Sequence, residues 1–211
     1  MRALVNRAVR PEAVPPPSEE ARTFHEALPG YAPTPVHDLG DGVLVKDESR
    51  RLGLPAFKIL GASWAIERAL REAPEVGTVV AASAGNHGRA VAHEARRRGL
   101  RCRVFLPARS VAARREAIAG EGAEVVVVDG AYEDAVAAAA REGALPGALE
   151  IADVGTSGPA RWVIDGYATL FAEAAEQADF DLVVVPVGVG SLAAAAARAG
   201  ARWGVPVVGA E

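Results

Sequence analysis

The feature that most constrains the fold is a regular alternation of short apolar runs with longer amphipathic segments, beginning near residue 78. Apolar residues in the runs are continuous rather than alternating, as in strands that are covered on both faces. Strands separated by helices of this length indicate βαβ units and a parallel sheet, so the sequence predicts an α/β fold. The predicted strands are 78–82, 102–106 and 124–128, and the predicted helices are 88–98, 112–119 and 132–141.

The flanking segments continue the pattern. Residues 1–29, which contain Pro11 and Pro15–Pro17, are predicted to be an irregular lead-in. The chain stops two residues after its last predicted strand, with no closing helix, so we expect its last sheet to be incomplete. The other predicted elements are strands at 43–45, 182–187 and 206–209, helices at 57–71 and 162–178, and an Ala-rich helix from 192.

Composition indicates a globular protein: half of the 211 residues are apolar, 24% are charged, and the formal net charge is −4. Without a sustained basic run, neither nucleic acid nor a membrane surface is expected as a partner. Cys102 is the only cysteine, which excludes an intrachain disulfide and a Cys-based zinc site. We see no signal peptide and no apolar stretch of membrane-spanning length, and expect a cytoplasmic protein.

Two glycine-containing turns follow predicted strands, at the edge where parallel sheets bind ligands. The later turn, Gly188–Leu192, places two glycines before a helix whose free amides could hold a phosphate. The same glycines would also suit a tight turn without a ligand. This turn has neither the third glycine of a dinucleotide-binding fingerprint nor the lysine of a P-loop, which disfavours a nucleotide-binding dehydrogenase.

The earlier turn, Ser83–Gly88, offers a hydroxyl, an amide side chain and an imidazole, more than a helix cap requires. His87 has no second ligand at metal-binding spacing, so we expect a hydrogen-bonded structural residue and no metal site. Lys58 has almost wholly apolar neighbours in sequence. Its stem could reach the surface, or its amine could be desolvated and become a nucleophile and Schiff-base former.

Three segments together resemble the threonine-dehydratase-like family of pyridoxal-phosphate enzymes, or fold type II. They are Ala56–Ala62 around Lys58, Ser83–Gly88, and Gly188–Leu192, in the family's order and at similar spacing. Within the family, four segments are similar to the diaminopropionate ammonia-lyase branch: 28–35, 46–49, 86–89 and 189–192. The resemblance covers residues 24–211.

The resemblance implies a two-lobed α/β fold with pyridoxal 5′-phosphate between the lobes. The smaller domain would span 77–155. The larger would comprise 30–76 and 156–211, with its C-terminal part missing. Family members run well past this length and carry a Ser or Thr facing the pyridine nitrogen, which is not found here.

It also implies roles for individual residues. Lys58 would carry the cofactor as a Schiff base and act as base on the Cα proton, while Asp153 would help proton transfer on the L-isomer. Asp153 could instead be a turn or cap residue before Gly155. Asn86 would bond the cofactor's 3′-oxygen. The phosphate would be held by Gly188, Val189, Gly190, Ser191 and Leu192, and the substrate carboxylate by Ser83, Ala84, Gly85 and Asn86.

The implied reaction is elimination of ammonia from the small amino acid 2,3-diaminopropionate, giving pyruvate and ammonia. The branch commonly has an Asp at the position of Ala84, which cannot move a proton, and this argues against use of the D-isomer. A threonine or serine dehydratase and a truncated, catalytically inactive remnant stay open as alternatives. A homodimer is also implied.

Overall fold

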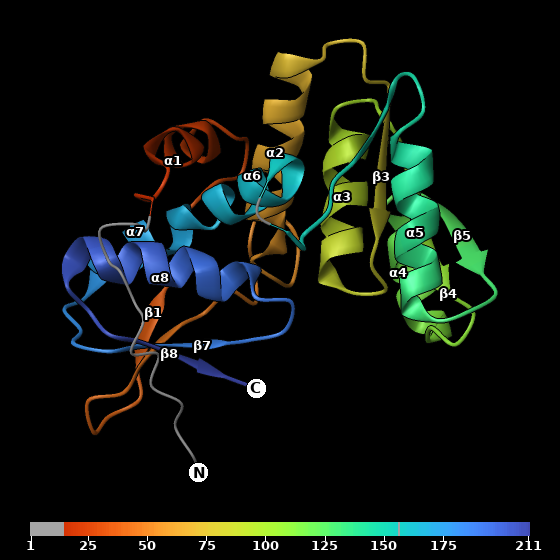
Figure 1. Cartoon of the computed structure of the whole chain (residues 1–211). Helices are drawn as coiled ribbons and strands as arrows, with labels where there is room; N and C mark the ends of the chain where they lie inside the picture. Colours follow the sequence, from red (N-terminus) through yellow and green to blue (C-terminus); the bar gives the residue numbers. More distant parts are fainter. Residues whose placement is uncertain (1–14, 156) are drawn as a thin grey trace.

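The predicted alternation folds into a four-stranded parallel sheet in the order β5–β4–β3–β6 (Figure 1). The computed structural model describes residues 15–155 and 157–211. The strands of this sheet are β3 (Thr78–Ala82), β4 (Arg101–Pro107), β5 (Glu124–Val128) and β6 (Ala148–Glu150). Its helices are α3 (Asn86–Arg97), α4 (Ala112–Gly120) and α5 (Tyr132–Gly143). The predicted α/β class is confirmed.

Strand β3 shows why its apolar run is continuous. Successive side chains of a strand point to opposite faces. Val79 joins the apolar cluster that contains Val91 of α3, whereas Val80 packs with Ala135 of α5. Helices therefore cover both faces of the strand, and all five of its residues are buried.

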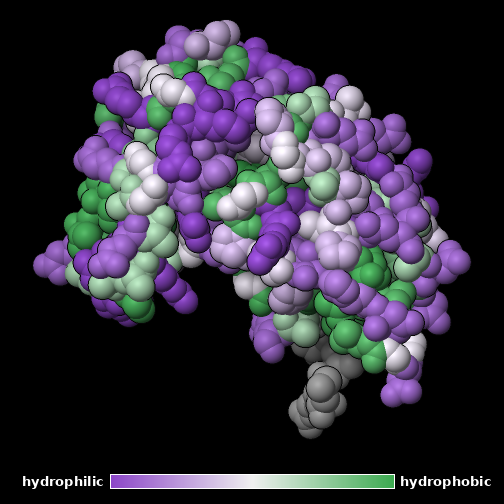
Figure 2. All heavy atoms as spheres, turned by 180° about the vertical axis from the view of Figure 1, so that it is seen from behind, coloured by the Kyte–Doolittle hydropathy of each residue, from purple (hydrophilic) through white to green (hydrophobic). Residues whose placement is uncertain are grey.

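The second lobe contains a pair of parallel strands, β7 (Val183–Pro186) and β8 (Val207–Ala210). Helix α8 (Ser191–Trp203) joins them, and α2 (Lys58–Glu72), α6 (Gly158–Gly166) and α7 (Ala168–Gln177) complete this lobe. An antiparallel pair, β1 (Val36–Asp38) and β2 (Leu44–Lys46), precedes α2. The space-filling view from behind shows the molecule hollowed between its lobes (Figure 2). The predicted domain boundaries stay a prediction.

The prediction of an irregular lead-in over residues 1–29 is wrong at 19–26, which form α1 (Glu19–Glu26). The Ser18 hydroxyl caps the helix by accepting from the Ala21 amide at 3.3 Å, and Glu19 and Glu20 suit the positive end of its dipole. These local signals outweigh the preceding prolines. Residues 1–14 lie outside the described residues.

Helix α1 is held to the second lobe by the buried His25. Its Nε2 donates to the Leu60 carbonyl at 3.0 Å, because a carbonyl can only accept. Nδ1 therefore accepts from the Thr169 hydroxyl at 2.7 Å. Burial lowers the pKa of His25 to about 3.

The single helix predicted over 162–178 is also wrong, because the chain forms two helices, α6 and α7, that meet at Tyr167. The Tyr167 amide bonds to the Ile164 carbonyl, three residues back, which tightens the last turn of α6. Gly166 packs directly against the backbone of α2. A Cβ at this position would clash with the Leu60 carbonyl and would lie only 2.8 Å from the Gly61 Cα. This close approach of α6 to α2 redirects the chain.

A buried ion network joins the segments before α2 to α7. Glu173 accepts from Arg51 at 2.7 Å, from Lys46 at 2.8 Å and from the Tyr31 hydroxyl at 2.8 Å. Burial raises the pKa of Glu173, but these donors outweigh burial and lower it to about 2. Two of the segments similar to the ammonia-lyase branch, 28–35 and 46–49, therefore meet in a structural network. No helix in the described ranges is both long and apolar enough to span a membrane.

Candidate active site

Lys58 is the first residue of α2, and its amine turns inward rather than to the surface. Its side chain is 18% exposed, and its Nζ donates to Asp153 Oδ2 at 2.9 Å. The rings of Phe57 and Tyr167 each lie with their centroid 5.6 Å from Nζ. The amine is therefore flanked by aromatic rings and one carboxylate, in the largely desolvated setting that a nucleophilic lysine needs.

Asp153 lies in the loop after β6, and its side chain is 10% exposed. Burial raises the pKa of this carboxyl, but the charge of Lys58 and its hydrogen bond help to hold it below the usual value. The carboxylate accepts a hydrogen bond from Lys58, which is 95 positions away in the sequence. Asp153 therefore makes a tertiary contact that a residue serving only a local turn would not make. Its predicted part in proton transfer stays a prediction.

His87 lies in the first turn of α3, behind Asp153. Its Nε2 donates to the Ile151 carbonyl at 2.7 Å, so the neutral ring has its lone pair on Nδ1. Nδ1 lies 4.0 Å from Asp153 Oδ2 and has no hydrogen-bond partner among the described residues. Burial lowers the pKa of His87. The expected hydrogen-bonded role of His87 is confirmed.

The loop Ser83–Asn86 follows the carboxyl end of β3. Gly85 and Asn86 are exposed and border a cavity of about 190 Å³ that Arg89 and Arg114 also line. In the described part of the chain, Lys58 bonds only to Asp153, so the structure does not join Asn86 to the lysine. The placement of this loop at the ligand-binding edge of the sheet agrees with its predicted role, which stays a prediction.

The glycine turn Gly188–Gly190 connects β7 to α8. Gly190 precedes the helix and has a φ of +91°. This left-handed backbone conformation favours glycine, because other residues adopt it only with strain. The first amides of the 13-residue α8 have no partners within the helix. Ser191, 4% exposed, has a hydroxyl with no hydrogen-bond partner in the described ranges. This turn therefore offers unpaired donors of the kind that bind a phosphate.

Tyr167 is a site residue that the sequence did not reveal. It is fully buried, packs edge-on against Phe57 with centroids 5.1 Å apart, and has its ring beside the Lys58 amine. A Cβ at Gly61 would lie 2.6 Å from its ring, so the glycine of the lysine motif makes room for it. Gly166, a glycine inside a helical pattern, was the available signal for a break here.

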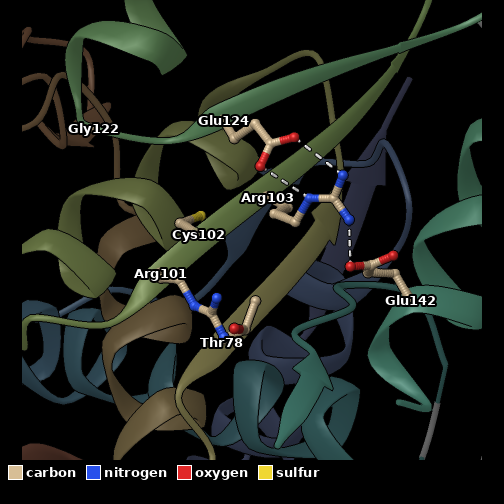
Figure 3. Close-up of a pocket in the computed structure, with 7 residues that line it drawn as sticks. All are labelled: Thr78, Arg101, Cys102, Arg103, Gly122, Glu124 and Glu142. Carbon is tan, nitrogen blue, oxygen red and sulfur yellow. Dashed lines mark hydrogen bonds and ion pairs between the residues drawn. The ribbon is translucent and has the colours of Figure 1, made fainter. Parts of the chain in front are cut away.

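A cavity of about 420 Å³ lies at the opposite end of the sheet's strands (Figure 3). Thr78 and Arg101 begin their strands, so this cavity is at the amino ends, away from the ligand-binding edge. The guanidinium of Arg103 is already paired with Glu124 and Glu142. Cys102 in its wall has its pKa raised to about 12 by burial, so it is not a nucleophile.

The first turns of α2, α3 and α8 all face the middle of the molecule, between the lobes (Figure 1). These helix starts and the loop after β6 bring together an amine for a Schiff base, the Asp153 carboxylate beside it, and a turn with unpaired donors. The buried hydroxyls without partners fit a phosphate-bearing group, and Lys58 fits its aldehyde. This fold and site define a pyridoxal-phosphate-dependent enzyme of fold type II.

Comparison with known proteins agrees: the family model "Pyridoxal-phosphate dependent enzyme" matches residues 27–211, and the chain belongs to this family. Diaminopropionate ammonia-lyase of Escherichia coli K12 is 35% identical over 212 residues, covering 87% of this chain and 53% of the relative. The biosynthetic L-threonine dehydratase of Pasteurella multocida is 33% identical over 176 residues, which cover 76% of this chain and 32% of that relative.

The solved structures agree with the sequences. Apo diaminopropionate ammonia-lyase of Escherichia coli superposes with a TM-score of 0.83 at 33% identity, covering 91% of this chain and 63% of that chain. The chain thus spans about half the length of the ammonia-lyases that it matches.

Proposed function

We propose that this chain supports pyridoxal-phosphate-dependent elimination of ammonia from 2,3-diaminopropionate, giving pyruvate and ammonia. The observation that carries the proposal is the Lys58–Asp153 pair, whose Nζ and Oδ2 atoms lie 2.9 Å apart in a largely buried setting. The choice of substrate is supported by the 35% identity to a diaminopropionate ammonia-lyase. When bound, the cofactor supplies the electron sink for loss of the Cα proton.

The chain's own residues supply attachment, orientation and proton transfer. Lys58 would hold the cofactor covalently, and its amine would take the Cα proton of the substrate. Asp153, in contact with the Lys58 amine, holds or passes on that proton for the L-isomer. The amides of 188–192 hold the phosphate, while Asn86 and the 83–86 loop orient the cofactor ring and the substrate carboxylate.

A threonine or serine dehydratase is the second candidate, since the chain is 33% identical to an L-threonine dehydratase. The two reactions need the same lysine and cofactor and differ in the leaving group. A catalytically inactive form is the third candidate. A cytoplasmic location and a homodimer are parts of the same proposal.

The first experiment compares absorbance spectra of the wild type and Lys58→Ala after incubation with pyridoxal phosphate and dialysis. The wild type is expected to keep a cofactor band near the visible–ultraviolet border, and Lys58→Ala to lose it. Arg109→Ala, an exposed change outside the site, is the control and should keep the band. Folded wild-type protein without the band would exclude the catalytic proposal.

The second experiment measures pyruvate and ammonia from 2,3-diaminopropionate, and 2-oxo acids from L-threonine and L-serine. The highest kcat/KM is expected for the L-isomer of 2,3-diaminopropionate. A higher value for either hydroxy amino acid would replace the lyase proposal with a dehydratase. A cofactor-loaded protein inactive on all three would favour the inactive form.

A further inference from the structure

We propose that the Tyr167 hydroxyl, together with the Ser191 hydroxyl, is a ligand for the phosphate end of the cofactor. This inference rests on the proposed binding of pyridoxal phosphate and names a further positioning residue for it. Tyr167 belongs neither to the lysine motif nor to either glycine turn.

The position of the Tyr167 ring is fixed by packing. The ring lies where α6 ends and α7 begins, edge-on to Phe57, and occupies the space left by the missing side chain of Gly61. Its centroid is 5.6 Å from the Lys58 amine. The hydroxyl therefore has a fixed position, and a ligand can reach it only by binding at that position.

The hydroxyl itself is unexplained by the fold. Tyr167 is 0% exposed, yet its hydroxyl has no hydrogen-bond partner among the described residues. Burying a hydroxyl without a partner is unfavourable, and a phenylalanine would pack in the same space without that cost. Unpaired buried polar groups of this kind call for a bound water, ion or ligand.

The neighbours of the hydroxyl indicate which ligand it meets. Burial and the Asp153 carboxylate raise the pKa of the Tyr167 hydroxyl well above its usual value, while a weak hydrogen-bonding interaction with the neighbouring Ser191 hydroxyl lowers it. The phenol thus keeps its proton and donates, and its surroundings include the first residue of α8. Ser191 is also buried with an unpaired hydroxyl.

The two neighbouring hydroxyls and the free amides that begin α8 together offer more donors than acceptors. A phosphate group supplies several charged acceptor oxygens, and its charge is favoured at a helix amino terminus. The Lys58 amine lies nearby for the aldehyde end of the same molecule. The donors therefore match the phosphate of a cofactor bound through Lys58.

The test uses Tyr167→Phe, which removes only the oxygen. We expect pyridoxal phosphate to bind about tenfold or more weakly to this variant in equilibrium dialysis, since a hydrogen bond to a charged group is lost. Pyridoxal, which lacks the phosphate, should bind the variant and the wild type equally. The thermal midpoint of the cofactor-free variant should be unchanged or raised, because an unpaired buried hydroxyl is removed.

The matched control is Tyr31→Phe, whose hydroxyl bonds to Glu173 at 2.8 Å away from the site. It should lower the thermal midpoint and leave pyridoxal phosphate affinity unchanged. The proposal is overturned if Tyr167→Phe binds pyridoxal phosphate like the wild type, or weakens pyridoxal equally. A wild type that binds neither molecule overturns this inference and the proposed function together.

Discussion

Three polar side chains, Lys58, Asp153 and His87, share the space at the start of α2. The neutral ring of His87 presents a lone pair toward the Asp153 carboxylate 4.0 Å away, which is unfavourable without a proton between them. The Lys58 ammonium compensates by donating to the same carboxylate oxygen at 2.9 Å. If Lys58 carried the cofactor, its amine would no longer donate to Asp153 in this way, and the Asp153–His87 pair would gain affinity for a proton. This arrangement supports the proposal that Asp153 receives a proton during turnover.

The corresponding residue-scale prediction concerns Asp153→Asn. The variant keeps the shape of the side chain but cannot take up a proton, so kcat for L-2,3-diaminopropionate should fall about 10²- to 10⁴-fold. The affinity for pyridoxal phosphate should change by less than about threefold, because the loss of one charge leaves an acceptor for Lys58. Steady-state kinetics and equilibrium dialysis measure the two effects.

Asp181→Asn, an exposed carboxylate before β7, is the control and should match the wild type in both measurements. If Asp153→Asn retained wild-type kcat, Asp153 would be a structural partner of Lys58 and not a proton carrier.

At the scale of elements, the position of the site depends on how closely α6 approaches α2. Gly166 contacts the Leu60 carbonyl and the Gly61 backbone, neither of which can move aside as a side chain would. Gly166→Ala should therefore lower the free energy of unfolding by about 1–3 kcal/mol through overpacking. Urea denaturation of the cofactor-free chain measures this.

Gly120→Ala is the matched control, because an added Cβ at this residue of α4 meets no atom within 4 Å. It should leave stability unchanged or raise it by up to about 1 kcal/mol. Equal losses in the two variants would show that the α2–α6 contact is not tightly packed.

Helices and strands that are specified by their own local sequence pattern were predictable from the sequence. Strands β3 and β5 lie at the predicted residues, because their β-branched or small apolar runs match strands covered by helices. Gly166 was a weak signal for the break at Tyr167, but the contact with Leu60 and Gly61 of α2, which redirects the chain, is visible only in the folded structure. Lys58 could be singled out from its neighbours in the sequence. The unpaired hydroxyls of Tyr167 and Ser191 are visible only in the folded structure, because they depend on packing between distant segments.

At the scale of the whole molecule, two buried histidines couple folding to pH. His25 and His87 both have their pKa lowered by burial, to about 3 for His25. The unfolded chain binds these protons near pH 6.5 and the folded chain does not. The contribution of these two histidines to the free energy of unfolding is therefore complete above about pH 6.5 and decreases as the pH falls below that value. The carboxylates with lowered pKa, such as Glu173, act only below about pH 4.5. Glu150, whose pKa is raised by burial, acts in the opposite sense to the histidines, so the comparison with a histidine variant is needed to separate their effects.

The last prediction concerns that comparison. Between pH 7 and pH 5 the free energy of unfolding should fall, with His25 alone contributing about 2 kcal/mol, since each pH unit below 6.5 costs about 1.4 kcal/mol. His25→Gln should be less stable at pH 7, because the bonds to Leu60 and Thr169 are disturbed. Its stability should nevertheless fall less steeply toward pH 5, because glutamine does not titrate. Urea midpoints of both chains at the two pH values measure this difference, and parallel slopes would mean that α1 detaches and exposes His25 without global unfolding.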